Sequence, residues 1–196
     1  MSRPKTYDDE LRRRLIVLAA EAIAVGGPGS VAMRVLAKAA DTSTNAIYAI
    51  FGSKDDLVTA VLEEAFESLG SAQRAALRTD DSLADFAEMG RIYRRWALDH
   101  PTLYHVMFGR RDLHGPLSRE QINVSMAPLL TAVERCIEDG FVRPVDPRLA
   151  AVSMWSAVHG AVSLEIAGYL DAGELGAQYE EHLVASAVYW LDGLAG

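Results

Sequence analysis

Apolar residues recur along this chain of 196 residues at intervals of three and four, and no segment sustains an apolar–polar alternation between hairpin turns. One such stripe consists of Leu11, Leu15, Leu18, Ala22 and Val25. It ends at the Gly-Gly-Pro-Gly turn of residues 26–29, as a helix commonly does. Because a helix repeats every 3.6 residues and a strand every two, we expect an all-α fold of about nine helices.

Length and composition limit the architecture further. A chain of this length can bury one small and one larger domain, and half of its residues are hydrophobic. No stretch approaches the roughly 18 uninterrupted apolar residues of a membrane span. The single Cys136 excludes an internal disulfide framework, and no basic, apolar leader opens the chain. We therefore expect a globular cytoplasmic protein with no membrane partner.

The charge is distributed unevenly. The formal net charge of −8 argues at first against a nucleic-acid partner, which needs local Lys and Arg. Residues 1–60, however, hold eight Lys or Arg against seven Asp or Glu, whereas residues 61–196 hold eleven against twenty. This asymmetry predicts two functions on one chain.

Two short helices and a tight turn are expected within residues 31–51. The first helix spans about 31–40, Ser43 is a good N-cap after the turn, and the second helix spans about 44–51. In the second helix, Ile47 and its apolar neighbours point inward, leaving Asn45 and Tyr48 outward. This spacing is typical of a helix-turn-helix, although a helical corner with solvated polar residues fits it too.

The outward residues of the second helix suit the major groove of DNA. Asn45 can pair with adenine through two hydrogen bonds, and Thr44 or Ala46 can touch a thymine methyl group. Tyr48 and Lys54 are placed to hold phosphates. The candidate DNA-binding residues are Arg34, Ser43, Thr44, Asn45, Ala46, Tyr48 and Lys54.

Residues 10–66 resemble the DNA-binding segment of the TetR family of bacterial repressors. The resemblance is carried by "VLAAEAIAVGG" and "RVLAKAADTSTNAIYAIFGSKDDLVTAVLEEAF". It implies that the second helix reads the major groove and that Tyr48 and Lys54 contact phosphate. The chain departs from the family pattern at Ala32, Asp41, Ala49 and Ile50. These departures imply fewer contacts to the DNA backbone, with more weight on Arg34 and on the basic tail that carries Arg3 and Lys5.

The acidic part of the chain is rich in aromatic residues and Met at helical spacing. Any one of them is a plausible core residue, but together they can surround an apolar cavity with a few polar anchors. "YRRWALDHPTLYHVMFG" and "MWSAVHGAVSLEIAGYL" also resemble one ligand-binding class of TetR-type C-terminal domains, recognised by its Trp-x-x-x-His-Gly pattern. By that resemblance the candidate ligand-binding residues are Tyr93, Trp96, Tyr104, Met107, Trp155 and His159.

The histidines also raise the question of a metal or catalytic site. His100 and His105 are five residues apart across a proline, whereas metal ligands on a helix need a spacing of three or four. No nucleophile-elbow or Cys-His pattern is present in the sequence. We therefore predict no metal site, no cofactor and no catalytic residues. A small helical enzyme that acts on an apolar substrate in the same bundle remains the alternative.

These observations predict a one-component regulator with a helix-turn-helix domain at residues 1–52 and a ligand-binding and dimerisation domain at residues 53–196. Its expected partners are double-stranded DNA with a pseudo-palindromic operator, a small and largely apolar effector, and a second copy of the chain. Repression is favoured because a dimer seated on a promoter blocks it sterically. The dimer is expected through the last two helices, whose small residues allow close approach and whose final apolar stripe is Leu183, Ala187, Trp190 and Leu194.

Overall fold

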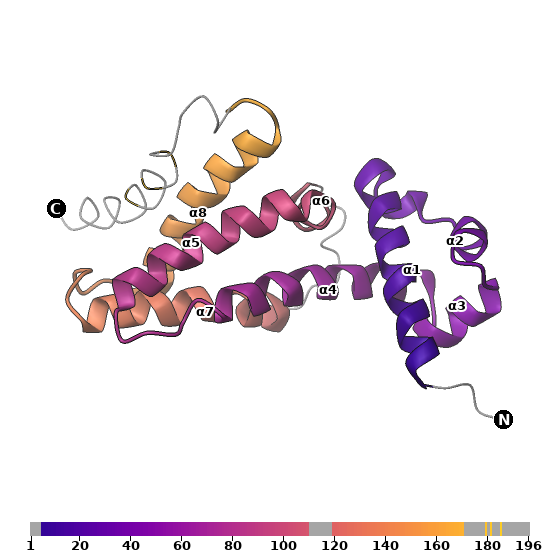
Figure 1. The fold of residues 1–196 in the computed structure, drawn as a ribbon, viewed down its shortest axis with the longest axis horizontal. Coiled ribbons are helices and arrows are strands. Elements are labelled where there is room, and N and C mark those ends of the chain that lie inside the picture. The colour runs from indigo at the N-terminus through magenta and orange to yellow at the C-terminus, as the bar shows by residue number, and fades with distance from the viewer. Residues whose placement is uncertain (1–4, 110–118, 171–178, 180, 182–184, 186–196) are drawn as a thin grey trace. The chain divides into compact units, whose positions relative to one another are not determined.

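The computed structural model describes residues 5–109, 119–170, 179, 181 and 185. Within these residues the fold consists of eight α-helices and one short 3-10 turn, and no strand occurs there (Figure 1). The chain divides into two compact units. The first comprises residues 1–67 and 100–122, and the second comprises residues 68–99 and 123–196. The expected all-α fold is confirmed, with a helix count in the described residues close to the expected nine.

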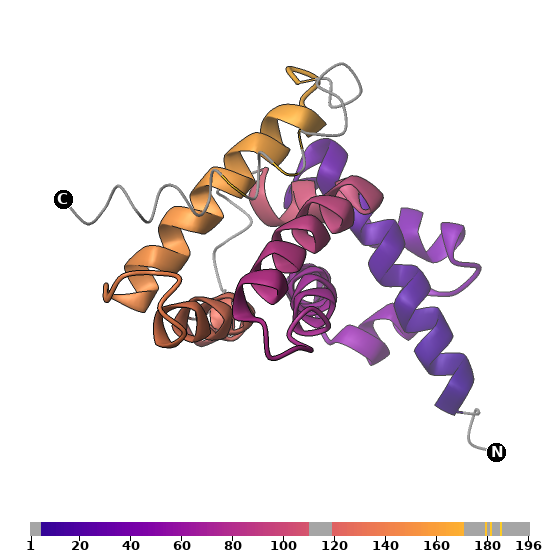
Figure 2. The same cartoon turned by 60° about the vertical axis from the view of Figure 1, so that its left-hand side comes forward.

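The first compact unit is built around the helix-turn-helix. Its elements are α1 (Lys5–Gly26), η1 (Pro28–Ser30), α2 (Met33–Ala39), α3 (Thr44–Phe51), the first part of α4 (Lys54–Arg74), and α6 (Pro101–Phe108). Figures 1 and 2 both show α2 and α3 beside α1. The core of this unit contains Leu15, Ile23, Ile47, Leu57 and Val106, all fully buried. Of the apolar stripe expected on the first helix, Leu11 and Leu15 are buried in this core and Leu18 and Ala22 pack against it. The expectation was wrong for Val25, which is 91% exposed at the end of the helix.

The second compact unit is a bundle formed by the end of α4, α5 (Ser82–Asp99), most of α7 (Arg119–Glu138) and α8 (Pro147–Ile166). Helix α5 begins where the Asp81 side chain accepts a hydrogen bond from the Ala84 amide at 2.9 Å. Helix α8 begins in the same way, with Asp146 accepting from the Arg148 amide at 2.8 Å. An aspartate is a good N-cap because its carboxylate satisfies an unpaired amide and suits the positive end of the helix dipole.

A charged cluster holds three parts of this bundle together. The Asp85 carboxylate on α5 is only 3% exposed, and it accepts hydrogen bonds from the amide and hydroxyl of Thr79. The Arg135 guanidinium on α7 lies 2.7 Å from Asp85 and donates a second bond to the Thr79 carbonyl at 2.6 Å. Burial opposes ionisation of Asp85, but the bonds from Arg135 and Thr79 outweigh it, so the pKa of Asp85 lies below its usual value.

Helix α8 has an apolar surface that the described residues leave uncovered. Met154, Val158 and Val162 point into the bundle, whereas Leu149 is 57% exposed and Val152 is 49% exposed. By length and composition alone, α8 is the one helix in the described ranges that could cross a membrane. A helix that packs into a bundle on one face and against another surface on a second face has the same composition, so this finding identifies no membrane span.

We predict that Asp85→Asn lowers the free energy of unfolding by roughly 1–3 kcal/mol, because the neutral amide loses the charged bonds from Arg135 and Thr79. Urea denaturation of the two proteins at pH 7.5 measures this difference. The matched control is Asp80→Asn, an exposed position in the same loop, for which little change is expected.

The same variant should reduce the loss of stability in acid. The lowered pKa of Asp85 means that its contribution is present at neutral pH and is lost as the pH falls through the folded-state pKa. Wild type should therefore approach Asp85→Asn in stability as the pH falls below the usual aspartate pKa. Equal stabilities of the two proteins at pH 7.5 would show that the cluster contributes nothing.

Candidate DNA-binding surface and ligand pocket

Helix α3 divides cleanly into a buried and an exposed face. Ile47 is fully buried, whereas Asn45, Tyr48 and Ala49 are exposed. The helix spans Thr44–Phe51, which are the expected bounds. Ser43 caps it, because its hydroxyl accepts a hydrogen bond from the Ala46 amide at 3.1 Å. The inward and outward positions predicted from the sequence are confirmed, and Ser43 has a structural role in addition to its predicted role at the DNA.

The turn before α3 needs an unusual backbone conformation. Asp41 has a φ of 51°, in the left-handed region that glycine adopts most easily. Aspartate tolerates this region better than most residues, which explains how it can occupy a position where related turns commonly have glycine. Helix α2 begins at Met33 without a side-chain cap, because Ala32 at the N-cap position has no polar group. The departures at Ala32 and Asp41 therefore have different structural consequences.

Basic residues around the helix-turn-helix also stabilise it. The Arg14 guanidinium donates to the Ala39 carbonyl at 3.0 Å, at the C-terminal end of α2. The Arg12 guanidinium lies over the Phe51 ring, 5.6 Å from its centre. The Lys54 ammonium donates to the Gly29 carbonyl at 3.1 Å. An ammonium group has three donors, so Lys54 can hold Gly29 and still contact a phosphate. Arg34 on α2 is exposed.

The junction between α3 and α4 combines a glycine with a capping serine. Gly52 has a φ of 86°, and a Cβ atom there would lie 3.0 Å from Asp56 Oδ2. Its amide donates to the Tyr48 carbonyl at 2.9 Å, which ends α3. The Ser53 hydroxyl accepts from the Asp56 amide at 3.0 Å and donates to the Asp56 carboxylate at 2.7 Å. These bonds set the position of Lys54 at the first turn of α4.

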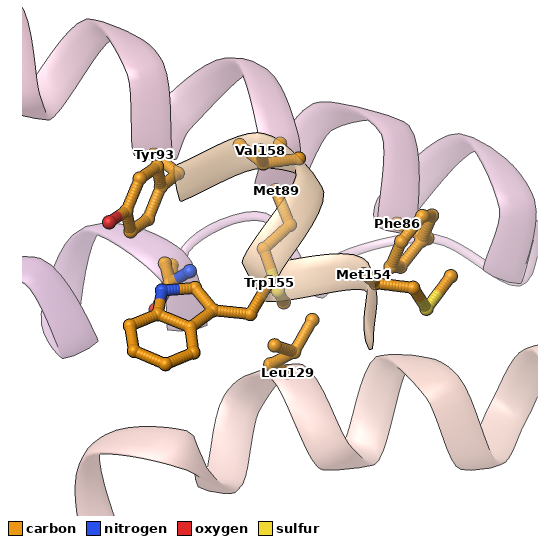
Figure 3. Close-up of a pocket in the computed structure, with 9 residues that line it drawn as sticks. Phe86, Met89, Tyr93, Leu129, Met154, Trp155 and Val158 are labelled. Atoms are coloured by element: carbon orange, nitrogen blue, oxygen red, sulfur yellow. The ribbon is translucent and has the colours of Figure 1, made fainter. Parts of the chain in front are cut away.

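A separate, mostly apolar pocket lies in the second compact unit (Figure 3). Its cavity volume is about 30 Å³. Its nine lining residues come from four helices: Gln73, Phe86, Met89, Gly90, Tyr93, Leu129, Met154, Trp155 and Val158. An apolar concave site with few polar groups is typical of small-molecule binding.

Tyr93 and Trp155 are joined at the pocket through His159. The Tyr93 hydroxyl and His159 Nδ1 share a hydrogen bond at 2.8 Å. The indole ring of Trp155 lies 5.1 Å from the imidazole ring, centre to centre. Burial lowers the pKa of His159, because the charged imidazolium loses water. His159 is therefore neutral at neutral pH, and it helps orient Tyr93 and Trp155 at the cavity.

The remaining predicted ligand-binding residues lie elsewhere. Trp96 is buried in the second compact unit, and its indole N–H donates to the Ser68 hydroxyl at 3.0 Å. Tyr104 and Met107 are on α6, in the first compact unit, and both are buried. These three residues do not line the pocket, and neither does His159, so only Tyr93 and Trp155 of the six predicted residues line it. A role of the six in ligand binding stays a prediction.

Most of the lining residues were not identified from the sequence as ligand contacts. Phe86, Met89 and Tyr93 recur on one face of α5, so helical spacing from Tyr93 could have identified the first two. Leu129 and Gln73 carried no such signal, because each comes from a different helix. In the residues that the structure describes, no group of three His, Cys, Asp or Glu side chains could hold a metal ion.

Comparisons with known proteins cover both the N-terminal and the C-terminal part of the chain. Residues 86–187 match a family model described as the Tetracyclin repressor-like, C-terminal domain. Residues 15–61 match the model for bacterial regulatory proteins of the tetR family. The chain belongs to the TetR family. Membership makes it a DNA-binding transcriptional regulator, and the helix-turn-helix of TetR-family proteins corresponds here to α2 and α3.

Individual relatives and solved structures are similar to this chain over most of their length. An HTH-type transcriptional regulator of Mycobacterium tuberculosis is 22% identical to this chain over 202 residues, covering 85% of each protein. A solved structure from Rhodococcus sp. RHA1 is 27% identical, with a TM-score of 0.74 over 95% of this chain and 96% of that one. A TetR-family regulator from Marinobacter aquaeolei VT8 has a TM-score of 0.79 at 20% identity, over 94% and 97% of the two chains.

The outward face of α3 predicts how three variants differ in DNA binding. If Asn45 contacts a base edge, Asn45→Ala should lose roughly 1–3 kcal/mol on the operator and scarcely change binding to unrelated DNA. Tyr48→Phe and Lys54→Ala should weaken binding to both, because phosphates are present in any sequence. Loss of Lys54 should also lower the salt slope by roughly one per subunit.

Fluorescence anisotropy with operator and scrambled duplexes, over a series of salt concentrations, separates these effects. Circular dichroism should accompany Lys54→Ala, because that variant also removes the bond to the Gly29 carbonyl. Unchanged operator affinity in all three folded variants would contradict base reading by α3.

The lowered pKa of His159 predicts a loss of stability in mild acid. Below about pH 6.5 the unfolded chain takes up a proton on this residue that the folded chain resists, so stability falls as the pH falls. His159→Gln should therefore lose less stability between pH 7.5 and pH 5 than wild type does. Urea denaturation at both values tests this, with the exposed His105→Gln as the control that should follow wild type. The same pH dependence in His159→Gln and wild type would refute the prediction.

Proposed function

We propose that this TetR-family regulator is a repressor that binds a pseudo-palindromic operator as a dimer and is released by a small, largely apolar molecule. The observation that carries the proposal is the division of α3. The Ile47 side chain of α3 is fully buried in the core, whereas Asn45, Tyr48 and Ala49 lie together on the exposed face of the helix. Such a helix can enter the major groove as a preformed unit, and a dimer doubles the surface it reads. Residues 1–52 form the DNA-binding domain in this proposal, and residues 53–196 carry the remaining functions.

An uncovered face of α8 supports the dimer. Ser153, Ala157, Gly160 and Leu164 share one side of this helix, and all are partly or largely exposed. A Cβ atom added at Gly160 would meet nothing within 4 Å, so another surface can approach the backbone closely there. We propose that a second copy of the chain covers this face. The partner helix expected at residues 183–194 lies outside the described residues.

The pocket supports control by a ligand. Helix α4 is continuous from Lys54, at the helix-turn-helix, to the turn that carries Gln73, at the pocket. A molecule that prefers one packing of the bundle can therefore bias the position of the DNA-binding domains through this helix. We expect a coupling free energy of about 1–3 kcal/mol, the usual range for such regulators. The protein would perform this function in the bacterial cytoplasm, where its DNA lies.

The proposal predicts that assembly and operator binding fail together. Gly160→Arg places a long charged side chain on the uncovered face of α8, where it should prevent close approach of a second copy. We expect a monomer in sedimentation velocity and a strongly weakened gel shift on the DNA upstream of the protein's own gene. The exposed Ala127→Arg on α7 is the matched control, which should remain dimeric and bind as wild type does.

Two outcomes would contradict the proposal. A wild-type protein that stays monomeric at micromolar concentration would exclude the dimer. A dimer that does not shift its own upstream DNA in preference to scrambled DNA would contradict an operator in that region, and a wider selection from random duplexes would then test DNA binding itself.

A further inference from the structure

The exposed face of α3 has a defined centre. Ile47 is fully buried in the core of the first compact unit. Because residues advance by about 100° around a helix, Asn45 and Ala49 each lie about 160° from Ile47, on either side of the direction opposite to it. Tyr48 and Ala46 lie about 100° from Ile47, on the two flanks. Asn45 and Ala49, both exposed, are therefore the two residues of α3 at the middle of its outward face.

The backbone that carries these two residues is fixed at both ends of the helix and can approach another surface closely. The Ser43 hydroxyl accepts a hydrogen bond from the Ala46 amide at 3.1 Å, and the Gly52 amide donates to the Tyr48 carbonyl at 2.9 Å. The side chains of Ala46 and Ala49 are single methyl groups. When α3 enters the major groove, even the short side chain of Ala49 can therefore reach the edge of a base.

The composition of α3 limits which bases it can read. Its sequence, TNAIYAIF, contains no Arg or Lys, the commonest readers of guanine, and no Asp or Glu, which accept a hydrogen bond from cytosine. Asn45 carries the only carboxamide of the helix, and a carboxamide matches the N6 and N7 atoms of adenine through two hydrogen bonds. The outward face of α3 thus has a reader for adenine and lacks the usual readers for a G·C pair.

Ala49 has a different match in the major groove. Its side chain has no polar atom, and thymine is the only base that presents an apolar group there, the C5-methyl. Against any other base edge, the methyl group of Ala49 would exclude water from a polar atom without replacing its hydrogen bond. Asn45 and Ala49 are one turn apart, roughly 6 Å along the helix, and successive base pairs are about 3.4 Å apart. Their target bases therefore lie about two base pairs apart when α3 follows the groove.

We propose that each operator half-site carries two A·T pairs beneath α3, with an adenine recognised by Asn45 and, about two base pairs away, a thymine whose C5-methyl group is recognised by Ala49. The inference rests on the proposed function, in which α3 reads the operator. It makes Ala49, one of the positions where the chain departs from the family pattern, a residue that determines specificity. The departure then replaces one kind of DNA contact with another.

Replacement of thymine by uracil tests the contact with a single methyl group. The wild-type dimer first selects its preferred duplex from a random library. Each thymine of that duplex is then replaced by deoxyuridine, which pairs with adenine but lacks the C5-methyl, and the dissociation constants are measured by fluorescence anisotropy. At one position we expect affinity to fall about fourfold per half-site, and about fifteenfold when both half-sites are changed, because burial of one methyl group is lost.

Variants of Ala49 assign the effect to this residue. Ala49→Gly removes the methyl group and should bind the thymine and uracil duplexes equally at that position. Ala39→Gly, at an exposed alanine of α2, is the matched control and should keep the wild-type preference for thymine. Ala49→Arg should instead prefer a G·C pair at that position, because arginine can bond guanine O6 and N7. Circular dichroism reports folding, and if Ala49→Gly does not fold, Ala49→Arg decides the question.

The outcomes separate this inference from the proposed function. If the wild-type protein enriches no sequence, both the operator and the reading of thymine are refuted. An enriched duplex in which uracil replaces every thymine in turn without loss of affinity would overturn the role of Ala49 and leave operator binding intact. So would a uracil penalty that persists at every position in Ala49→Gly, or a thymine preference that persists at every position in Ala49→Arg.

Discussion

The DNA-binding surface depends on the packing of α2 and α3 into a hydrophobic core, because these helices have only seven and eight residues. Helices shorter than about 12 residues are marginal in water on their own. These two are held because Leu36, Ala37 and Ile47 are buried in one core with residues of α1 and α4. Full burial of one large aliphatic side chain stabilises by about 1.5–3 kcal/mol. Core packing therefore fixes the position of the outward residues of α3. Polar substitutions on that face can change DNA recognition without unfolding the helix.

The pocket depends on a different kind of contact, two polar pairs that join α5 to α8. Tyr93 bonds His159, and on the adjacent position of α5 the Arg94 guanidinium bonds Glu165 twice. Buried charged pairs contribute little net stability, because desolvation offsets their attraction. They are directional, however, and a helix that slides or rotates loses them. We interpret these pairs as the contacts that set the register of α5 against α8, and hence hold Tyr93 and Trp155 at the cavity.

The helix-turn-helix could be predicted closely because its signals are local. The cap Ser43, the apolar Ile47 and the end of the helix at Gly52 all lie within ten residues of chain, and the observed bounds of α3 match those expected. The pocket could be predicted only in part. Tyr93 and Trp155 line it, but Tyr104 and Met107 are buried in the other compact unit. Helical spacing could not separate these cases, because an aromatic residue or Met with that spacing can equally be a core residue. Gln73 had no sequence signal, since a glutamine on a helix is ordinarily solvated.

The sequence by itself determined which residues form helices and which face of each is apolar, because both follow from periodicity and capping within a few residues. Tertiary structure alone decided which polar groups meet. Tyr93 and His159 are 66 positions apart, Asp85 and Arg135 are 50 apart, and Lys54 and Gly29 are 25 apart. No local pattern encodes such pairs, because each depends on the angle and register at which two helices pack. The same packing brought Gln73 to the pocket beside residues of three other helices.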